Sequence, residues 1–261
     1  MNKIEAVFHE KKKVFIPFVT AGDPSLAITE ELIYAMEKAG AGLIEIGIPF
    51  SDPIAEGVVI QNADNRALAA GCTLDAIFAM LKRVRQNTQI PLVFLTYINP
   101  IMTYGKEKFF AQSKAVDICG MIVPDVPYEE KSLLADVSAK YNIDIITMIA
   151  PTSEQRIKTL AKDARGYIYI VSSLGVTGVR SNITTDIGAI VAQIREVTKT
   201  PLAVGFGIAT PGQAKKMAAL SDGAIVGSAI VKLIAKYGEA CVEPVAVYVK
   251  EMAEAVAACA R

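Results

Sequence analysis

Short apolar segments alternate with longer amphipathic segments along almost the whole chain, and this alternation limits the folds that the chain can adopt. The short segments, rich in β-branched residues, are eight candidate strands: Val14–Thr20, Gly42–Gly47, Pro91–Leu95, Gly120–Val123, Asp144–Met148, Tyr167–Val171, Leu202–Val204 and Gly223–Val226. The segments with apolar residues at three- and four-residue spacings are the candidate helices between them: Ile28–Ala39, Thr73–Val84, Tyr128–Lys140, Ser153–Lys162, Ile187–Thr198 and Pro211–Leu220.

Strands this short and apolar are typical of a parallel sheet covered by helices, because a strand buried on both faces loses its polar alternation. Eight repeats favour closure, so we predict an α/β protein with a (β/α)8 TIM-barrel fold. A doubly wound open sheet is the alternative. Two extra terminal helices are predicted, Lys3–Glu10 and Pro244–Ala258, and no linker-like stretch divides the chain. Residues 1–261 are therefore expected to form a single barrel domain, a size usual for this fold.

Composition narrows the class of ligand. Basic and acidic side chains balance at 27 each, which argues against a nucleic-acid or membrane-surface partner and favours a small molecule or a protein. The segment Met1–Lys13 lacks the apolar run of a signal peptide, and no run is long enough to span a membrane, so we expect a cytoplasmic protein. Four scattered cysteines and a single histidine, His9, predict no metal site and no disulfide framework.

Two glycine-containing turns are candidates for binding an anion. Gly205 and Gly207 follow the seventh candidate strand, before a helix that Thr210 is placed to cap. Gly227 and Ser228 end the eighth strand and lead directly into a helix over Ala229–Ala235, whose first amides lack backbone partners. Loops after strands seven and eight of such barrels often bind phosphate, so a phosphorylated substrate is predicted. The alternative is that each glycine serves only a turn or close packing.

A third glycine-containing loop, Ser172–Gly178, follows the sixth candidate strand. It fits a lid over the active site or an ordinary surface loop, and the sequence leaves both open.

An acidic residue in the middle of the second candidate strand is the main candidate for chemistry. Glu45 stands between apolar neighbours, where burial of a charge is costly, and a desolvated carboxyl group can exchange protons near neutral pH. The following loop, Ile48–Gly57, carries Asp52 and Glu56, either of which could face Glu45 across the barrel mouth. Two carboxyl groups in different surroundings can divide acid and base roles without a cofactor. A buried ion pair at Glu45 and a solvated acidic loop are the structural alternatives.

Other mechanisms have less support in the sequence. No lysine lies inside a candidate strand, so a Schiff-base mechanism has no obvious nucleophile. His9 lies outside the barrel pattern, which argues against a histidine-bound metal and against a Ser-His-Asp triad.

Several motifs, in order and over almost the whole chain, resemble those of the tryptophan synthase α chain family. The most specific is the stretch from Glu45 to Pro53, Glu-Ile-Gly-Ile-Pro-Phe-Ser-Asp-Pro. The others are Pro17–Pro24, Tyr97–Pro100, Pro124–Pro127, Leu174–Gly178, Gly205–Ile208 and Val226–Ile230.

This resemblance implies a lyase that cleaves indole-3-glycerol phosphate to indole and glyceraldehyde 3-phosphate in tryptophan biosynthesis. It implies assembly with a β subunit as an αββα heterotetramer, with pyridoxal phosphate in the partner and no cofactor in this chain. Glu45 matches the family's acid-base carboxylate. Glu56 matches the residue that holds and deprotonates the indole nitrogen, normally an aspartate. Glu56 is thus a departure, as is Val58 where proline is usual, and lyase activity could be reduced.

The remaining site residues follow from matched positions. Phe18, Ile60 and Tyr169 would line the indole pocket, although Phe18 and Ile60 also suit a simple core. Thr177 would help to close the site over Glu56. The residues expected to hold the phosphate group are Gly178, Gly207, Gly227 and Ser228.

Two other functions remain open on the sequence. The chain could be a largely non-catalytic subunit that acts mainly as an allosteric activator of a β subunit, a hypothesis that the Glu56 departure motivates. It could also be a related phosphate-binding barrel, such as a sugar-phosphate isomerase or another lyase of amino-acid synthesis.

Overall fold

A computed structural model describes residues 2–172, 186–205 and 207–260 of the chain. In this part of the chain the strands form one parallel sheet with the order β5-β4-β3-β2-β1-β9-β8-β7-β6. The strands are β1 (Val14–Thr20), β2 (Ile44–Gly47), β3 (Leu92–Leu95), β4 (Ile118–Ile122), β5 (Asp144–Ile145), β6 (Thr147–Ile149), β7 (Ile168–Val171), β8 (Leu202–Gly205) and β9 (Gly223–Val226).

The fifth predicted strand links the two edges of this sheet. Its first half, β5, pairs with β4, and its second half, β6, pairs with β7. Ile146 separates the halves, and its amide still donates a hydrogen bond of 2.8 Å to the Met121 carbonyl. One segment therefore joins both edges, and the sheet forms a nearly closed barrel. The predicted TIM-barrel fold is confirmed, and the open-sheet alternative is wrong.

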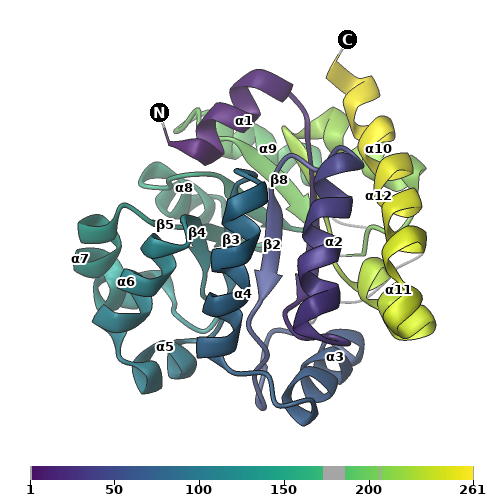
Figure 1. Cartoon of the computed structure of the whole chain (residues 1–261). Coiled ribbons are helices and arrows are strands. Elements are labelled where there is room, and N and C mark those ends of the chain that lie inside the picture. Colours follow the sequence, from purple (N-terminus) through teal and green to yellow (C-terminus); the bar gives the residue numbers. More distant parts are fainter. Residues whose placement is uncertain (1, 173–185, 206, 261) are drawn as a thin grey trace.

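Helices surround this barrel (Figure 1). The described helices are α1 (Lys3–Lys11), α2 (Leu26–Lys38), α3 (Val58–Ala69), α4 (Leu74–Asn87), α5 (Ile98–Tyr104), α6 (Lys106–Ala115), α7 (Ser132–Tyr141), α8 (Glu154–Lys162), α9 (Ile187–Arg195), α10 (Pro211–Leu220), α11 (Ser228–Tyr237) and α12 (Val242–Ala257). The apolar spacing predicts the positions of most of these to within a few residues, but it does not predict α3, α5 and α6. The buried face of α3 is made largely of small or polar residues, which gives a weak apolar pattern.

Helix α1 covers the end of the barrel at which the strands begin. Asn2 and Glu5 form a capping box that starts the helix, and its buried residues Ile4 and Phe8 join the cluster inside the barrel. The rings of Phe8 and Tyr167 lie 6.0 Å apart between centroids. Figure 1 shows α3 and α5 at the opposite end, to which the β2 arrow points. The open mouth is therefore at the carboxyl ends of the strands, where the active sites of such barrels lie.

Side chains alternate between two apolar clusters along each strand. Residues such as Ile44 and Ile46 of β2 pack outward beneath the helices, whereas Leu43 belongs to the cluster in the barrel interior. The same alternation turns Glu45 inward. No helix in the described part of the chain is long and apolar enough to cross a membrane.

Candidate active site

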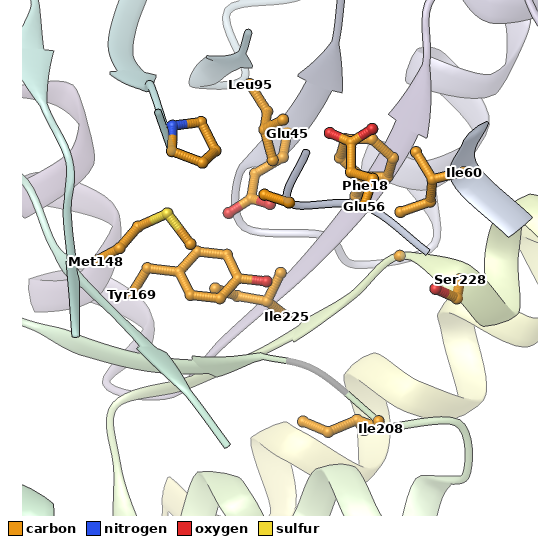
Figure 2. A pocket seen from close by; sticks show the side chains of 14 residues that line it. Phe18, Glu45, Glu56, Ile60, Leu95, Met148, Tyr169, Ile208, Ile225 and Ser228 are labelled. Carbon is orange, nitrogen blue, oxygen red and sulfur yellow. The ribbon is translucent and has the colours of Figure 1, made fainter. Parts of the chain in front are cut away.

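The barrel mouth contains a cavity that brings together eight of the ten site residues named from the sequence. Figure 2 shows its lining, with Met148 and Tyr169 on one side and Ser228 on the other. The eight residues are Phe18, Glu45, Glu56, Ile60, Tyr169, Gly207, Gly227 and Ser228. The other two, Thr177 and Gly178, lie outside the described residues, as does the loop 173–178 that could form a lid.

Glu45 is a buried acid without a basic partner in the described part of the chain. Only 1% of its surface is exposed, and the hydroxyl group of Tyr167 on the chain before β7 donates a hydrogen bond of 2.5 Å to its Oε1 atom. Burial raises the pKa of Glu45 to about 8, although the bond from Tyr167 acts in the opposite direction. The ion pair considered from the sequence is absent here, and Glu45 carries a proton at neutral pH.

The loop after β2 places one of its two acidic residues in the cavity. Asp52 is exposed and accepts a hydrogen bond from the Ser51 hydroxyl group. Glu56 is 4% exposed and lines the cavity, and its carboxyl group forms hydrogen bonds with Asp64 of α3 and with the Tyr97 hydroxyl group. Of the two acids that could face Glu45 across the barrel mouth, Glu56 therefore lies in the cavity and Asp52 does not.

Asp64 is a buried acid that is not among the site residues expected from the sequence. Burial, followed by the charge of Glu56, raises the pKa of Asp64 to about 9. Burial also raises the pKa of Glu56, but hydrogen bonds from Asp64 and Tyr97 oppose that shift. A signal was present in the sequence, because Ile60, Asp64 and Ala67 share a helical face and an acid on an apolar face needs a partner.

Apolar side chains form the walls around Glu45. Phe18 stands opposite Glu45 in the pairing of β1 with β2, and both line the cavity. Two glycines make room for aromatic rings: a Cβ atom on Gly47 would lie 2.6 Å from Cζ of Phe18, and one on Gly205 would lie 2.3 Å from the Tyr169 hydroxyl oxygen. The remaining apolar lining includes Ile60, Leu95, Met148, Pro124 and Ile225. These walls suit a flat apolar ring.

The two glycine turns lie on the same cavity. Gly207 has a φ of 76°, which glycine adopts without strain, and it leads to the Thr210 capping box that begins α10. Helix α11 begins at Ser228 after Gly227, and no side chain caps its first amides. Helix-start amides without a side-chain cap favour an anion, so this side of the cavity suits a phosphate group.

A family model described as tryptophan synthase alpha chain matches residues 4–257. Among curated relatives, the tryptophan synthase alpha chain of Lacticaseibacillus casei is 44% identical over 256 residues, which cover 98% of this chain and 96% of the relative. That of Alkaliphilus metalliredigens is 46% identical over 233 residues, which cover 89% and 88%.

Solved structures agree with these relatives. Tryptophan synthase subunit alpha from Legionella pneumophila str. Paris has a TM-score of 0.89 at 35% identity, and the match covers 98% of each chain. A chain from Pyrococcus furiosus, solved to study mutual activation of the tryptophan synthase a2b2 complex, has a TM-score of 0.82 at 32% identity and covers 92% of this chain and 97% of its own.

Proposed function

The chain belongs to the tryptophan synthase alpha chain family, and from this premise we propose that it cleaves indole-3-glycerol phosphate to indole and glyceraldehyde 3-phosphate. Membership makes it the α subunit of an enzyme of tryptophan biosynthesis, with a lyase role. The observation that carries the specific reaction is the protonated Glu45 in the wall of an apolar cavity whose other side suits phosphate.

The proposed reaction begins with two proton transfers to and from the indole ring. Glu45 donates its proton to C3 of the ring, and Glu56 accepts the proton of the ring nitrogen, which gives the 3H-indole tautomer. A carboxyl group that is protonated at neutral pH can act as the acid in this step. The ring then has a C=N bond that can receive an electron pair.

Carbon–carbon bond cleavage follows from the charge left on Glu45. Its carboxylate removes the proton from the hydroxyl group on the carbon attached to C3, and this carbon becomes the aldehyde of glyceraldehyde 3-phosphate. The electrons of the broken bond restore the C2=C3 double bond of indole, and the nitrogen regains its proton from Glu56. Both carboxyl groups return to their starting states, and neither water nor an oxidant is consumed.

The cavity supports this assignment of its two sides. The apolar side chains of Phe18, Ile60 and Tyr169 would hold the indole ring, while the turns at Gly207 and Gly227, with Ser228, would hold the phosphate group. Thr177 and Gly178 are proposed to complete the site on the family resemblance alone.

A β subunit is the proposed protein partner, and pyridoxal phosphate would belong to that subunit rather than to this chain. Apolar residues after β2 and β3 support a partner surface at the barrel mouth: Ile54 is 72% exposed, Val58 66% and Met102 51%. A partner seated there would lie next to the cavity in which indole forms. The relative from Pyrococcus furiosus was solved in a study of an a2b2 complex, which supports an αββα assembly.

A direct assay tests the proposed function. Indole formation from indole-3-glycerol phosphate is measured for the isolated chain and for the chain mixed with a β subunit, and turnover is expected to be higher in the mixture. Absence of cleavage in both states would exclude the lyase. The second candidate function is a largely non-catalytic activator of the β subunit, because Glu56 stands where the family normally has aspartate. Unchanged β-subunit activity on mixing would exclude this activator function.

A further inference from the structure

The carboxyl groups of Glu56 and Asp64 form a buried pair beside the cavity. Glu56 belongs to the loop before α3 and Asp64 to the second turn of α3, and 4% and 3% of their surfaces are exposed. The two groups are hydrogen-bonding partners. A hydrogen bond between two carboxyl groups requires a proton on one of them.

The nearest basic residue on the same helix does not neutralise the pair. Arg66 donates hydrogen bonds of 2.8 and 2.7 Å from Nε and Nη2 to the two carboxylate oxygens of Asp23. This bidentate pair occupies the guanidinium group, and the charge of Asp23 adds to the repulsion at Asp64. Two buried carboxyl groups in contact cannot both ionise, so when one of them is charged the other holds a proton.

The surroundings of the pair decide where its charge lies. Glu56 lines the cavity, whereas Asp64 does not. Glu56 also accepts a hydrogen bond from the Tyr97 hydroxyl group, which is itself held by the Ala55 amide at 3.1 Å. Tyr97 is therefore a donor to Glu56 that Asp64 does not share. Burial and then the charge of Glu56 raise the pKa of Asp64 to about 9, although the Thr20 hydroxyl group acts in the opposite direction, and this agrees with a proton on Asp64.

We propose that Asp64 is a positioning residue that keeps the shared proton and uses it to donate a hydrogen bond to Glu56, so that the single charge of the pair rests on the carboxylate that faces the substrate. The part of this inference that concerns substrate rests on the proposed function. Only an ionised Glu56 can accept the proton of the indole nitrogen. The arrangement also gives a reason for glutamate at a position where the family normally has aspartate, because the longer side chain is held by a second carboxyl group on α3.

Two substitutions at Asp64 separate this role from simple packing. Asp64→Asn retains a donor toward Glu56 in nearly the same volume, whereas Asp64→Ala removes it. For Asp64→Ala we expect kcat to fall by about a hundredfold, the order seen when a reacting group is misplaced, with a smaller change in KM. Asp64→Asn is expected to retain kcat to within about tenfold because a neutral donor remains. Asp136→Asn, at an exposed aspartate of α7, is the matched control and should change neither constant.

Carboxyl NMR titration of the unliganded protein tests the shared proton without any substrate. With ¹³C-labelled aspartate and glutamate side chains, the Asp64 signal is expected to titrate far above the ordinary range of aspartate, while Glu56 is already ionised near neutral pH. Asp64→Asn should remove the high titration and leave Glu56 ionised, and Asp64→Ala should raise the pKa of Glu56.

The outcomes distinguish this proposal from the proposed reaction. An Asp64 signal that titrates in the ordinary range, or a proton on Glu56 at neutral pH, would overturn the proposal whether or not the wild-type chain is a lyase. In an active enzyme, equal losses of kcat in the Asn and Ala variants would also overturn it. A wild-type chain that shows the expected titration but no cleavage would refute only the reaction. If Asp64→Ala does not fold, the NMR titrations of the wild type and of Asp64→Asn still show whether Asp64 holds the shared proton.

Discussion

The hydroxyl group of Tyr167 donates a hydrogen bond of 2.5 Å to Oε1 of Glu45 inside the barrel, where both residues are buried. The bond joins the β2 side of the barrel to residues just before β7. It stabilises the ionised form of Glu45, whereas burial stabilises the neutral form, and burial has the larger effect. Glu45 is therefore protonated at neutral pH and still has a partner when it ionises.

Tyr167→Phe should raise the pKa of Glu45 further, because it removes a donor to the carboxylate. In the wild type, cleavage is expected to decline as pH rises through about 8, where Glu45 loses the proton that it must donate. In the variant this decline should move to higher pH, and the rate at neutral pH should fall by about tenfold because the carboxylate formed during the reaction loses its partner. A pH–rate profile measures both effects. Tyr34→Phe is the control, because the Tyr34 hydroxyl group also donates a hydrogen bond to a glutamate, Glu30, and neither residue lines the cavity. An unmoved profile in Tyr167→Phe would contradict the expectation.

Glu45→Gln should stabilise the folded chain at neutral and alkaline pH. The pKa of Glu45 rises from 4.5 to about 8 on folding. The contribution of Glu45 to the free energy of unfolding is therefore fully present below pH 4.5 and has been lost once the pH has risen through about 8. Between these values the free energy of unfolding should fall by about 1.4 kcal/mol per pH unit from this group alone. Urea unfolding at several pH values, compared between wild type and variant, isolates this contribution. Parallel curves for the two proteins would show that Glu45 does not titrate in this way.

Ser228→Ala should weaken phosphate binding more than it slows the chemistry. Ser228 is the first residue of α11, lines the cavity and adds a hydroxyl donor to the backbone amides there. Loss of one hydrogen bond to a charged group should raise KM for indole-3-glycerol phosphate about tenfold or slightly more, with kcat nearly unchanged. Ser132→Ala, at the exposed serine that is the first residue of α7, serves as the control. A drop in kcat at constant KM would place Ser228 in the chemical step instead.

Ile54→Glu should weaken association with a β subunit and leave turnover by the isolated chain unchanged. Ile54 is 72% exposed after β2, and a charge there would have to be desolvated in an apolar interface. Val247→Glu is a matched control, because Val247 is 51% exposed on α12 and neither it nor its helix lines the cavity. Calorimetric titration with the β subunit measures the difference. Equal affinities for the two variants would argue against a partner surface at Ile54.

The sequence predicts the fold well because the pattern of each strand is local. Strands β1 and β9 begin and end at the residues expected, and the Gly227–Ser228 turn leads into α11 as expected. The fifth strand is split at Ile146, and that division depends on which neighbour each half pairs with, information that no local pattern contains.

A site residue can be predicted from the sequence when it is an acid among apolar neighbours. Its hydrogen-bonding partner cannot be predicted in this way when that partner is distant in the sequence. Glu45 stands out in an apolar strand, but its partner, Tyr167, is 122 residues away in the sequence and looks like an ordinary interior aromatic. Asp64 was missed for a related reason: α3 was not recognised as a helix, so its acid was not seen to share a face with buried residues.

The most direct test of the account is cleavage of indole-3-glycerol phosphate by Glu45→Gln in the presence of a β subunit. Glutamine keeps the shape of the side chain but cannot donate and accept the proton, so kcat/KM should fall by about a thousandfold or more. Circular dichroism and binding to the β subunit should remain those of the wild type. Cleavage by Glu45→Gln at a rate near that of an active wild-type enzyme would contradict the central claim that Glu45 transfers the proton.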